Sequence, residues 1–471
     1  MTKIKFGTDG WRAIIAKDYT VDNVARVSKA TADWLLQNFD SPSITIGHDC
    51  RFGGEMFVET AIKIFVHQGI KVYTTDKGFV STPMISLATR ALGASLGVVI
   101  TASHNPPSYN GYKLKGHFGG PLAPELVDEI QSIITTTNEI NLDVISLEKA
   151  KEDGLIEFVD FEQLYIDQVK SVFDLDLISN AKFGWAYDAM YGAGQNVLKR
   201  LMPNMKFLHC DYNPSFHGQA PEPIHKNLIE FSNLIAADNT VDCGLATDGD
   251  ADRIGLYNSK GEFVDSHHII LLTIHYLVKY KGLTGKVVTG FSSTPRIKQM
   301  CDHYGLEHVE VPIGFKYISG LMADEKEDVL LGGEESGGIA LKTHIPERDG
   351  IWMGLTIWEF MAKTGKSLEE LIAEVYEIVG PFAFERSDLH ISNDSKKRII
   401  EKCKKKEFNL FGKYKVERTE TLDGFKYFFD ENRWLMIRPS GTEPVLRTYA
   451  EAPTLEEVRV ILESCKLTIG A

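Results

Sequence analysis

The sequence predicts a multidomain α/β protein whose last portion forms a smaller α+β domain. The chain has 471 residues, too many for one hydrophobic core, and domains of roughly 100–200 residues imply three or four of them. Short β-branched runs alternate with longer amphipathic stretches, which is typical of βαβ units and of mainly parallel sheets covered by helices. Near residue 380 the pattern changes to a basic run, a hairpin signal and a final helix.

The alternation of strands and helices starts early in the chain. The segment 54–68 predicts a helix, because Phe57, Ala61, Ile64 and Phe65 share one face. Strands are expected at residues 43–47, 70–73, 97–101, 183–187, 243–246 and 286–289. The similar segments Phe79-Val-Ser-Thr-Pro83 and Phe291-Ser-Ser-Thr-Pro295 each precede a helix-like stretch, which suggests a repeated α/β unit.

The C-terminal portion has a different composition. Lys402 to Lys406 is strongly basic, Asp423-Gly424 is a hairpin signal, and Leu455 to Cys465 predicts a final helix. Polar segments near residues 152–154, 259–261 and 380–381 suggest the domain boundaries. The predicted domains are residues 1–153, 154–258, 259–379 and 380–471.

Charge and composition exclude several classes of partner. The chain has 51 Lys and Arg against 65 Asp and Glu, a net charge of −14, so neither nucleic acid nor a membrane is expected as a partner. The most apolar run, Ile269 to Val278, is short and is interrupted by His275. The six cysteines are dispersed, which favours neither a zinc site nor disulfides, and with no signal peptide at the N-terminus a cytoplasmic location is expected. Because the net charge is negative, an anionic substrate must be held by a local cluster of Arg and Lys.

The first chemically informative loop is Thr101-Ala-Ser-His-Asn-Pro-Pro-Ser-Tyr-Asn-Gly-Tyr-Lys113. It follows a buried strand, so it lies where α/β proteins usually place their sites. Its prolines and its Asn-Gly pair force turns, and Ser103 is expected to be exposed beside His104 and within reach of Lys113. The competing reading is a polar connection in which the serine caps a helix.

The second loop is Thr247-Asp-Gly-Asp-Ala-Asp-Arg253. In an extended segment Asp248, Asp250 and Asp252 would face one side, and converging carboxylates favour a hard cation such as Mg²⁺. An EF-hand loop would need Gly and Glu where Arg253 and Ser259 stand. A phosphatase motif with an aspartate nucleophile is a second rival, opposed by the third acidic residue, the arginine after it and the late position of the motif.

Two further loops suit an anionic, hydroxylated ligand. Gly332-Gly-Glu-Glu-Ser-Gly-Gly338 offers Glu334 and Ser336 to hydroxyl groups, although alone it is more often a surface turn. Arg438-Pro-Ser-Gly-Thr-Glu-Pro-Val-Leu-Arg447 combines two arginines with Ser440, Gly441 and Thr442, which together suit a phosphate dianion. An ordinary turn between two unrelated arginines is the alternative.

Together the four loops resemble the α-D-phosphohexomutase superfamily, which includes phosphoglucomutases, phosphomannomutases and phosphoglucosamine mutases. Thr-Ala-Ser-His-Asn-Pro, Asp-Gly-Asp-Ala-Asp-Arg, Gly-Glu-Glu-Ser-Gly and Arg-Pro-Ser-Gly-Thr-Glu-Pro stand here in the family's order. Phe6-Gly-Thr-Asp-Gly-Trp-Arg12 is similar to its opening motif and Gly314-Phe-Lys316 to one of its substrate loops. The resemblance implies four domains around a central cleft, each donating one loop, the first three sharing an α/β topology.

The resemblance also implies roles for individual residues. Ser103 would carry the phosphoryl group and, with the three aspartates, bind Mg²⁺. Arg12, His104 and Lys113 match residues near the reacting group, and Lys113 would be the general base. The residues implied in substrate binding are Arg253, Lys316, Glu334, Ser336, Arg438, Ser440, Gly441, Thr442 and Arg447.

The reaction implied is exchange between a hexose 1-phosphate and a hexose 6-phosphate through a hexose 1,6-bisphosphate, which would also activate the enzyme. The expected partner is a small sugar phosphate, glucose first and mannose second, and the chain would be a monomer or a homodimer. A phosphoglucosamine mutase, a phosphopentomutase, a sugar phosphatase and a non-catalytic sugar-phosphate sensor are the alternatives.

Overall fold

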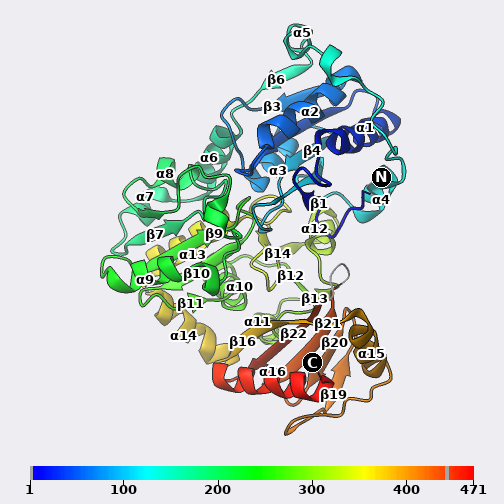
Figure 1. Ribbon diagram of the computed structural model, residues 1–471. Helices are drawn as coiled ribbons and strands as arrows, with labels where there is room; N and C mark the ends of the chain where they lie inside the picture. The colour runs from blue at the N-terminus through cyan, green and yellow to red at the C-terminus, as the bar shows by residue number, and fades with distance from the viewer. Residues whose placement is uncertain (1–3, 441–444, 471) are drawn as a thin grey trace. The chain divides into compact units, whose positions relative to one another are not determined.

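The computed structural model describes residues 4–440 and 445–470, which divide into two compact units (Figure 1). The first unit takes the described residues up to 288 together with residues 314–372. The second takes residues 289–313 and the described residues from 373 onward. Two of the sheets lie wholly within the first unit and two lie wholly within the second.

The first unit begins with a six-stranded mixed sheet of order β1-β5-β4-β2-β3-β6. Its strands are β1 (Trp11–Ile14), β2 (Ser43–His48), β3 (Lys71–Thr74), β4 (Leu96–Ile100), β5 (Tyr109–Gly116) and β6 (Ile156–Phe158). The four strands β4, β2, β3 and β6 run parallel. At one edge β5 pairs antiparallel with β4, and β1 pairs antiparallel with β5. The loops after β2 and β4 therefore leave the same end of the sheet.

Helices cover both faces of this sheet, and the central strands are accordingly buried on both sides: every residue of β4, and every residue of β2 except Ser43. Ile44 and Ile46 of β2 face α1 (Val21–Asn38) and α2 (Gly54–His67) in one continuous core. Thr45 and Gly47 face the opposite way, toward α3 (Thr82–Ala91). The helices α4 (Pro124–Ser132) and α5 (Leu147–Glu152) precede β6.

A second mixed sheet follows in the same unit, with the order β11-β10-β9-β7-β8. Its strands are β7 (Trp185–Asp188), β8 (Lys206–Leu208), β9 (Cys243–Thr247), β10 (Ile254–Asn258) and β11 (Phe263–Val264). The neighbouring helices are α6 (Phe161–Val172), α7 (Leu175–Ser179), α8 (Val197–Leu201) and α9 (Ile229–Ala237). β9 is parallel to β7 and antiparallel to β10, so the loop 248–253 reverses the chain at the end of a buried strand.

A third α/β region completes the first unit. It contains α10 (Ser266–His275), α12 (Phe315–Ala323), the antiparallel pair β14 (Val329–Gly333) and β15 (Ile339–Leu341), and α13 (Gly350–Thr364). The helix α13 is almost entirely buried, and the Asp349 side chain caps its start by accepting from the Trp352 N–H. This buried helix fixes the position of the loop 342–349 that precedes it.

The second unit contains an antiparallel sheet of order β16-β22-β21-β20-β19. Its strands are β16 (Ala383–His390), β19 (Arg418–Glu420), β20 (Phe425–Phe428), β21 (Trp434–Pro439) and β22 (Val445–Ala452). The helices α15 (Asn393–Lys404) and α16 (Leu455–Ile469) pack against it around Leu435, Leu446 and Ile461 (Figure 1). The unit also includes α11 (Arg296–Tyr304), β13 (His308–Val311) and the hairpin of β17 (Leu410–Phe411) with β18 (Tyr414–Lys415).

The predicted fold class is confirmed: mixed α/β sheets are followed by a smaller α+β domain. The six expected strands and the helix over 54–68 form with shifts of one or two residues, and Asp423-Gly424 turns between β19 and β20. The first two sheets extend past the predicted boundaries at 153 and 258, because β6 pairs with β3 and β11 with β10. No helix among the described residues is long and apolar enough to cross a membrane.

Two glycines of the first unit provide a matched test of its packing. A Cβ at Gly184, just before β7, would lie 1.6 Å from the Thr240 carbonyl oxygen, whereas a Cβ at Gly320 in α12 would meet nothing within 4 Å. We expect Gly184→Ala to lower the free energy of unfolding by about 3 kcal/mol or more, the upper range for overpacking. Gly320→Ala should be neutral or stabilising by up to about 1 kcal/mol, because alanine favours helix. Urea denaturation checks both, and equal effects would contradict this packing.

Candidate active site

Ser103 lies at the centre of a tightly closed loop after β4. It is 1% exposed and adopts φ 53°, a left-handed conformation that is unusual for a residue with a side chain. Its N–H donates to Thr101 Oγ1 at 2.9 Å, and its hydroxyl donates to Asp248 Oδ2 at 2.8 Å. The expectation that Ser103 is exposed is therefore wrong, because the loop 248–253 packs over it.

The three aspartates converge through a turn, which corrects the expectation of an extended segment. Asp248 Oδ1 accepts the backbone N–H groups of Asp252 at 2.9 Å and Arg253 at 3.1 Å, so the chain folds back on itself. Ala251 takes φ 58° within this turn. The three carboxylates come together because the backbone turns, and not because side chains alternate between the two faces of an extended strand.

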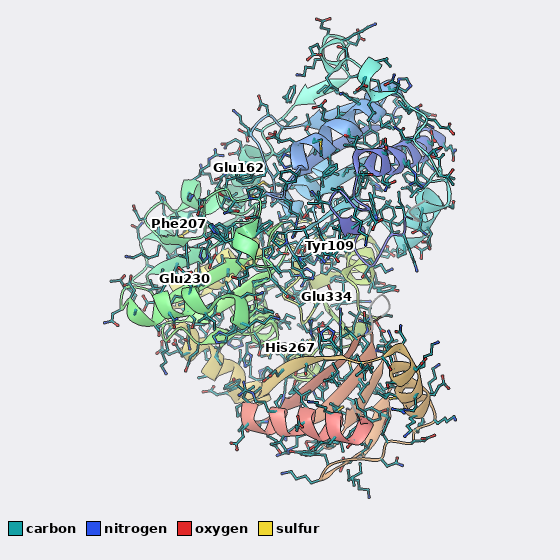
Figure 2. All side chains as sticks on the ribbon, in the orientation of Figure 1. Tyr109, Glu162, Phe207, Glu230, His267 and Glu334 are labelled. Carbon is teal, nitrogen blue, oxygen red and sulfur yellow. The ribbon has the colours of Figure 1, made fainter. Side chains whose placement is uncertain are left out.

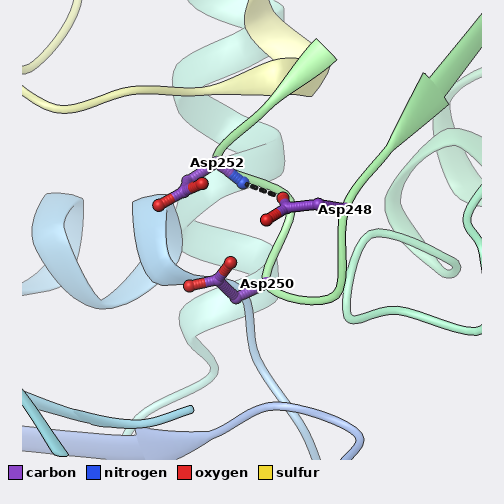
Figure 3. Close-up of side chains that lie close together, drawn as sticks. All are labelled: Asp248, Asp250 and Asp252. Carbon is purple, nitrogen blue, oxygen red and sulfur yellow. Dashed lines mark hydrogen bonds between the residues drawn. The ribbon is translucent and has the colours of Figure 1, made fainter. Parts of the chain in front are cut away.

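The arrangement suits a divalent cation. One oxygen from each of Asp248, Asp250 and Asp252 lies within 4.8 Å of the other two, and all three side chains are buried (Figure 3). Oδ1 of Asp250 and Oδ1 of Asp252 are buried without a hydrogen-bond partner. Burying a carboxylate oxygen without a hydrogen-bond partner costs free energy unless a cation binds to it. Carboxylate oxygens are hard ligands, which suit Mg²⁺. The donor set therefore fits the metal that the sequence suggested.

Positive side chains partly neutralise the triad. Lys113 Nζ of β5 lies 2.8 Å from Asp250 Oδ2 and 3.2 Å from Asp252 Oδ2. Arg348 Nη2 lies 2.8 Å from both Asp252 Oδ2 and Asp9 Oδ2, and Lys113 contacts Asp9 as well, at 2.9 Å. Two cations and an additional carboxylate thus surround the aspartates from three separate segments of the chain.

The electrostatics affect each titratable group differently. Burial, followed by the charges of Asp252 and Asp250, raises the pKa of Asp248 well above its usual value. Burial would also raise the pKa of Asp250, but Lys113 outweighs it and the pKa falls below its usual range. Burial would lower the pKa of Lys113, but the neighbouring carboxylates raise it. These ion pairs favour the charged form of Lys113, whereas the general-base role implied by the family resemblance requires the neutral form and stays a prediction.

The other residues expected near the reacting group lie around the loop that carries Ser103, residues 101–109, here called the serine loop. His104 Nδ1 is 3.3 Å from Ser103 Oγ, and burial together with nearby cations lowers the pKa of His104, which keeps the imidazole neutral. Arg12 Nη1 donates to Asn105 Oδ1 at 2.6 Å and so braces the same loop. The Arg253 side chain remains mostly buried, with Nη1 4.0 Å from Glu222.

The expected sugar-binding residues belong to the hairpin β14–β15 and to α12. Glu334 (labelled in Figure 2) is buried, and its Oε1 accepts the Gly314 N–H at 3.0 Å, which joins the two segments. Burial raises the pKa of Glu334 to about 7, although Arg348 acts in the opposite direction. Ser336 and Lys316 are partly buried in the same two segments.

Backbone contacts hold these loops together. A Cβ on Gly249 would lie 2.5 Å from the Ser103 carbonyl oxygen, so only glycine lets the two loops approach this closely. The Gly350 N–H donates to Ala251 O at 2.9 Å, which connects the turn to the start of α13. The Ile254 N–H donates to Gly337 O at 3.0 Å, which connects the turn to the hairpin β14–β15.

The second unit carries the loop expected to bind phosphate. Arg438 of β21 stands opposite Arg447 of β22, so two like charges face each other across the pair, an arrangement that favours an anion between them. Arg438 also forms two hydrogen bonds to Asp423 at 3.1 Å, and Lys396 Nζ donates to Ser440 O at 3.0 Å. Gly441 and Thr442 lie outside the described residues.

Three site residues were not identified from the sequence. Arg51 follows β2 and contacts the serine loop, Arg348 lies in the segment before α13, and Thr82 Oγ1 at the start of α3 donates to Asp250 Oδ2 at 2.6 Å. Arg51 could have been found as a charged residue following a buried strand at the same end of the sheet as Ser103. Thr82 belongs to the Phe79-Val-Ser-Thr-Pro83 segment, which stood out in the sequence only as a repeat. Arg348 stands in His344-Ile-Pro-Glu-Arg-Asp-Gly350, a segment that is similar to phosphoglucomutases but from which the sequence singled out no site residue.

Comparison with known proteins gives one consistent result. Four consecutive domain models match the chain, each described as phosphoglucomutase/phosphomannomutase: alpha/beta/alpha domain I over residues 3–141, domain II over 163–261, domain III over 265–379 and the C-terminal domain over 393–465. The four matches follow the order of the four motif loops.

Whole-chain comparisons agree with the domain models. A phosphoglucomutase/phosphomannomutase of Thermococcus kodakarensis is 29% identical over 97% of this chain and 96% of its own. A phosphoglucosamine mutase of Limosilactobacillus reuteri is 30% identical over 97% and 96%. A crystal structure of a phosphomannomutase-type protein of Thermus thermophilus is 31% identical, covers both chains completely and superposes with a TM-score of 0.87.

Glu334 gives the site a measurable pH dependence. Its pKa is about 7 in the folded protein, against an ordinary value of 4.5. Below pH 4.5 the carboxyl is neutral in both the folded and the unfolded protein, and its contribution to the free energy of unfolding is fully present. This contribution is lost as the pH rises from 4.5 toward 7, because the unfolded protein releases the proton first. The stability of the wild type relative to Glu334→Gln should therefore fall by about 3 kcal/mol between those pH values and then stay level. Urea denaturation at several pH values measures it, with the exposed Glu325→Gln as a control. A difference that does not change with pH would contradict the prediction.

Proposed function

Because the chain belongs to the phosphoglucomutase/phosphomannomutase family, whose members are isomerases that transfer phosphate intramolecularly, we propose that it interconverts hexose 1-phosphate and hexose 6-phosphate through phosphorylated Ser103. One observation carries the proposal: the Ser103 hydroxyl donates to Asp248 at 2.8 Å, beside two carboxylates with unpartnered buried oxygens. A nucleophile and a cation site in direct contact are what transfer of a dianionic phosphoryl group requires.

The residues of the chain have distinct roles in this proposal. Ser103 Oγ carries the phosphoryl group, and its loop holds the oxygen toward the aspartates. Asp248, Asp250 and Asp252 hold Mg²⁺, which when bound would neutralise charge on the phosphoryl oxygens. Lys113 and Arg348 add fixed positive charge on the other side of the carboxylates. Arg12 and His104 keep the serine loop in place.

Transfer from phosphoserine to the free hydroxyl of the sugar would give a hexose 1,6-bisphosphate. The sugar must then turn around, so that its other phosphoryl group can return to Ser103 and the isomeric monophosphate leaves. The burial of Ser103 supports a mutase over a phosphatase, because water that reached the phosphoserine would hydrolyse it. We propose Arg438, Ser440, Gly441, Thr442 and Arg447 as the clamp for the phosphate that is not reacting.

For the sugar, we propose that glucose 1-phosphate is the preferred substrate and that mannose 1-phosphate is also used. The buried Glu334 supports a contact with ring hydroxyls, and the family resemblance assigns Glu334 and Ser336 to positions where glucose and mannose are identical. Glucosamine phosphate is the second candidate, because several relatives at 27–30% identity are phosphoglucosamine mutases. Arg253 and Lys316 complete the proposed substrate contacts.

We expect Ser103→Ala to abolish mutase turnover while the protein remains folded, because the hydroxyl is the covalent carrier. After incubation with glucose 1,6-bisphosphate, intact-mass measurement should show one added phosphate in the wild type and none in the variant. Ser108→Ala, in the same loop, is the matched control and should remain phosphorylated on Ser103. Turnover by Ser103→Ala would sink the phosphoserine mechanism, and release of free phosphate in place of isomerised sugar would assign the chain as a phosphatase.

The sugar preference is tested by kcat/KM values measured side by side for glucose, mannose, glucosamine and ribose 1-phosphates. Glucose should be preferred over mannose by about 10–200-fold or less, since no identified group reads the hydroxyl at C2. A clear preference for glucosamine or ribose phosphate would refute the glucose assignment and leave the mutase proposal standing. Binding without turnover of any of the four would favour the sugar-phosphate sensor.

A further inference from the structure

Arg51 lies beneath the serine loop, where no substrate can reach it. It follows β2, it is 1% exposed, and the ring of Phe216 lies 5.0 Å from its Cζ. A fully buried arginine is rare unless its donors are engaged, because burial of an unpaired guanidinium is costly. The contacts of Arg51 therefore indicate what it does.

The guanidinium donates to four carbonyl oxygens of the serine loop. Nη2 donates to Ser103 O and to Asn105 O, the latter at 2.6 Å. Nη1 donates to Pro106 O at 2.9 Å and to Tyr109 O at 3.0 Å. The four carbonyls belong to residues 103–109, a stretch with few backbone–backbone hydrogen bonds. The Arg51 side chain therefore supplies the hydrogen bonds that regular secondary structure would otherwise give these carbonyls.

Asp49 fixes Arg51 and the start of the loop at the same time. Its Oδ2 lies 3.2 Å from Arg51 Nε and accepts the Thr101 hydroxyl at 2.6 Å, while Oδ1 accepts the Arg51 N–H at 2.9 Å. Thr101 Oγ1 in turn accepts the Ser103 N–H at 2.9 Å. The loop is therefore held from both sides of Ser103.

Ser103 needs this support because of its backbone conformation. A left-handed φ is unfavourable for a residue with a Cβ, and it persists only where the surroundings impose it. If the carbonyls were released, Ser103 would relax toward an ordinary conformation and its Oγ would move away from Asp248. Phosphoryl transfer depends strongly on such alignment.

We propose that Arg51, held by Asp49, is a positioning residue that keeps Ser103 in its left-handed conformation and so aligns Oγ with the metal-binding carboxylates. The inference rests on the phosphoserine mechanism proposed above. Arg51 contacts only backbone oxygens of the loop and is closed off from solvent. It therefore acts on the rate of phosphoryl transfer and not on the binding of the sugar.

The test uses Arg51→Lys, which keeps the charge but loses the planar fork that reaches four carbonyls. We expect kcat for glucose 1-phosphate to fall about 100-fold, the size of effect seen when a reacting group is displaced, with KM unchanged. Single-turnover phosphorylation of Ser103 by glucose 1,6-bisphosphate should slow by the same factor. Amide exchange over residues 101–110 should become faster, since the loop loses its support.

Arg26→Lys is the matched control, because Arg26 is also buried in the first unit and donates to the Thr135 carbonyl at 2.7 Å, away from the site. Its kcat should stay at the wild-type value. If Arg51→Lys does not fold, Asp49→Asn takes its place. The asparagine amide keeps one oxygen, which can accept from either the Thr101 hydroxyl or the Arg51 N–H, but it loses the ion pair with Arg51. We again expect kcat to fall with KM unchanged.

Three results would overturn the inference: wild-type kcat in folded Arg51→Lys and Asp49→Asn, an effect confined to KM, or an equal loss of kcat in Arg26→Lys. Failure of the proposed function gives a different result, because wild-type protein would then carry no phosphate on Ser103. A wild type that is phosphorylated and active, together with an unaffected Arg51→Lys, would reject the positioning role alone.

Discussion

Three carboxylates buried within 4.8 Å of one another are the constraint on which the rest of the site depends. Buried negative charge must be compensated, and the chain does so from segments that are distant in sequence: Lys113 in β5, Arg348 before α13 and the backbone N–H groups of the turn itself. This compensation is incomplete, since Asp250 and Asp252 each retain a buried oxygen without a hydrogen-bond partner. The remaining negative charge is what a divalent cation would neutralise.

Close approach of backbone segments makes this arrangement possible. Gly249 touches the Ser103 carbonyl, Ala251 O accepts from Gly350, and Asp250 O accepts the Thr82 N–H at the start of α3. Main-chain contacts within the first unit thus fix Ser103, the three aspartates and the hairpin β14–β15 relative to one another. Most side chains of the site can therefore be specialised for charge and chemistry, and Arg51 is an exception that holds a loop.

Much of this could be predicted from the sequence, because the predictive signals are local. Strand and helix periodicity located the main elements, and each motif loop drew attention to its own residues, whereas the grouping of Ser103 with Asp248, Asp250 and Asp252 came from the family resemblance. The burial of Ser103 could not be predicted in the same way, since it results from a loop about 145 residues further along the chain. Arg51 and Arg348 escaped notice for the same reason: their partners are defined only when separate segments fold together.

We propose that the aspartates and phosphorylated Ser103 form one metal centre. It can be tested most directly with Mn²⁺ in place of Mg²⁺, by measuring the magnetic coupling between the bound Mn²⁺ and phosphorus after treatment with glucose 1,6-bisphosphate. We expect one Mn²⁺ per chain, displaced by Mg²⁺, with a ³¹P coupling that Ser103→Ala lacks. Mn²⁺ bound without phosphorus coupling in fully phosphorylated protein, or undiminished binding in Asp250→Asn, would contradict it.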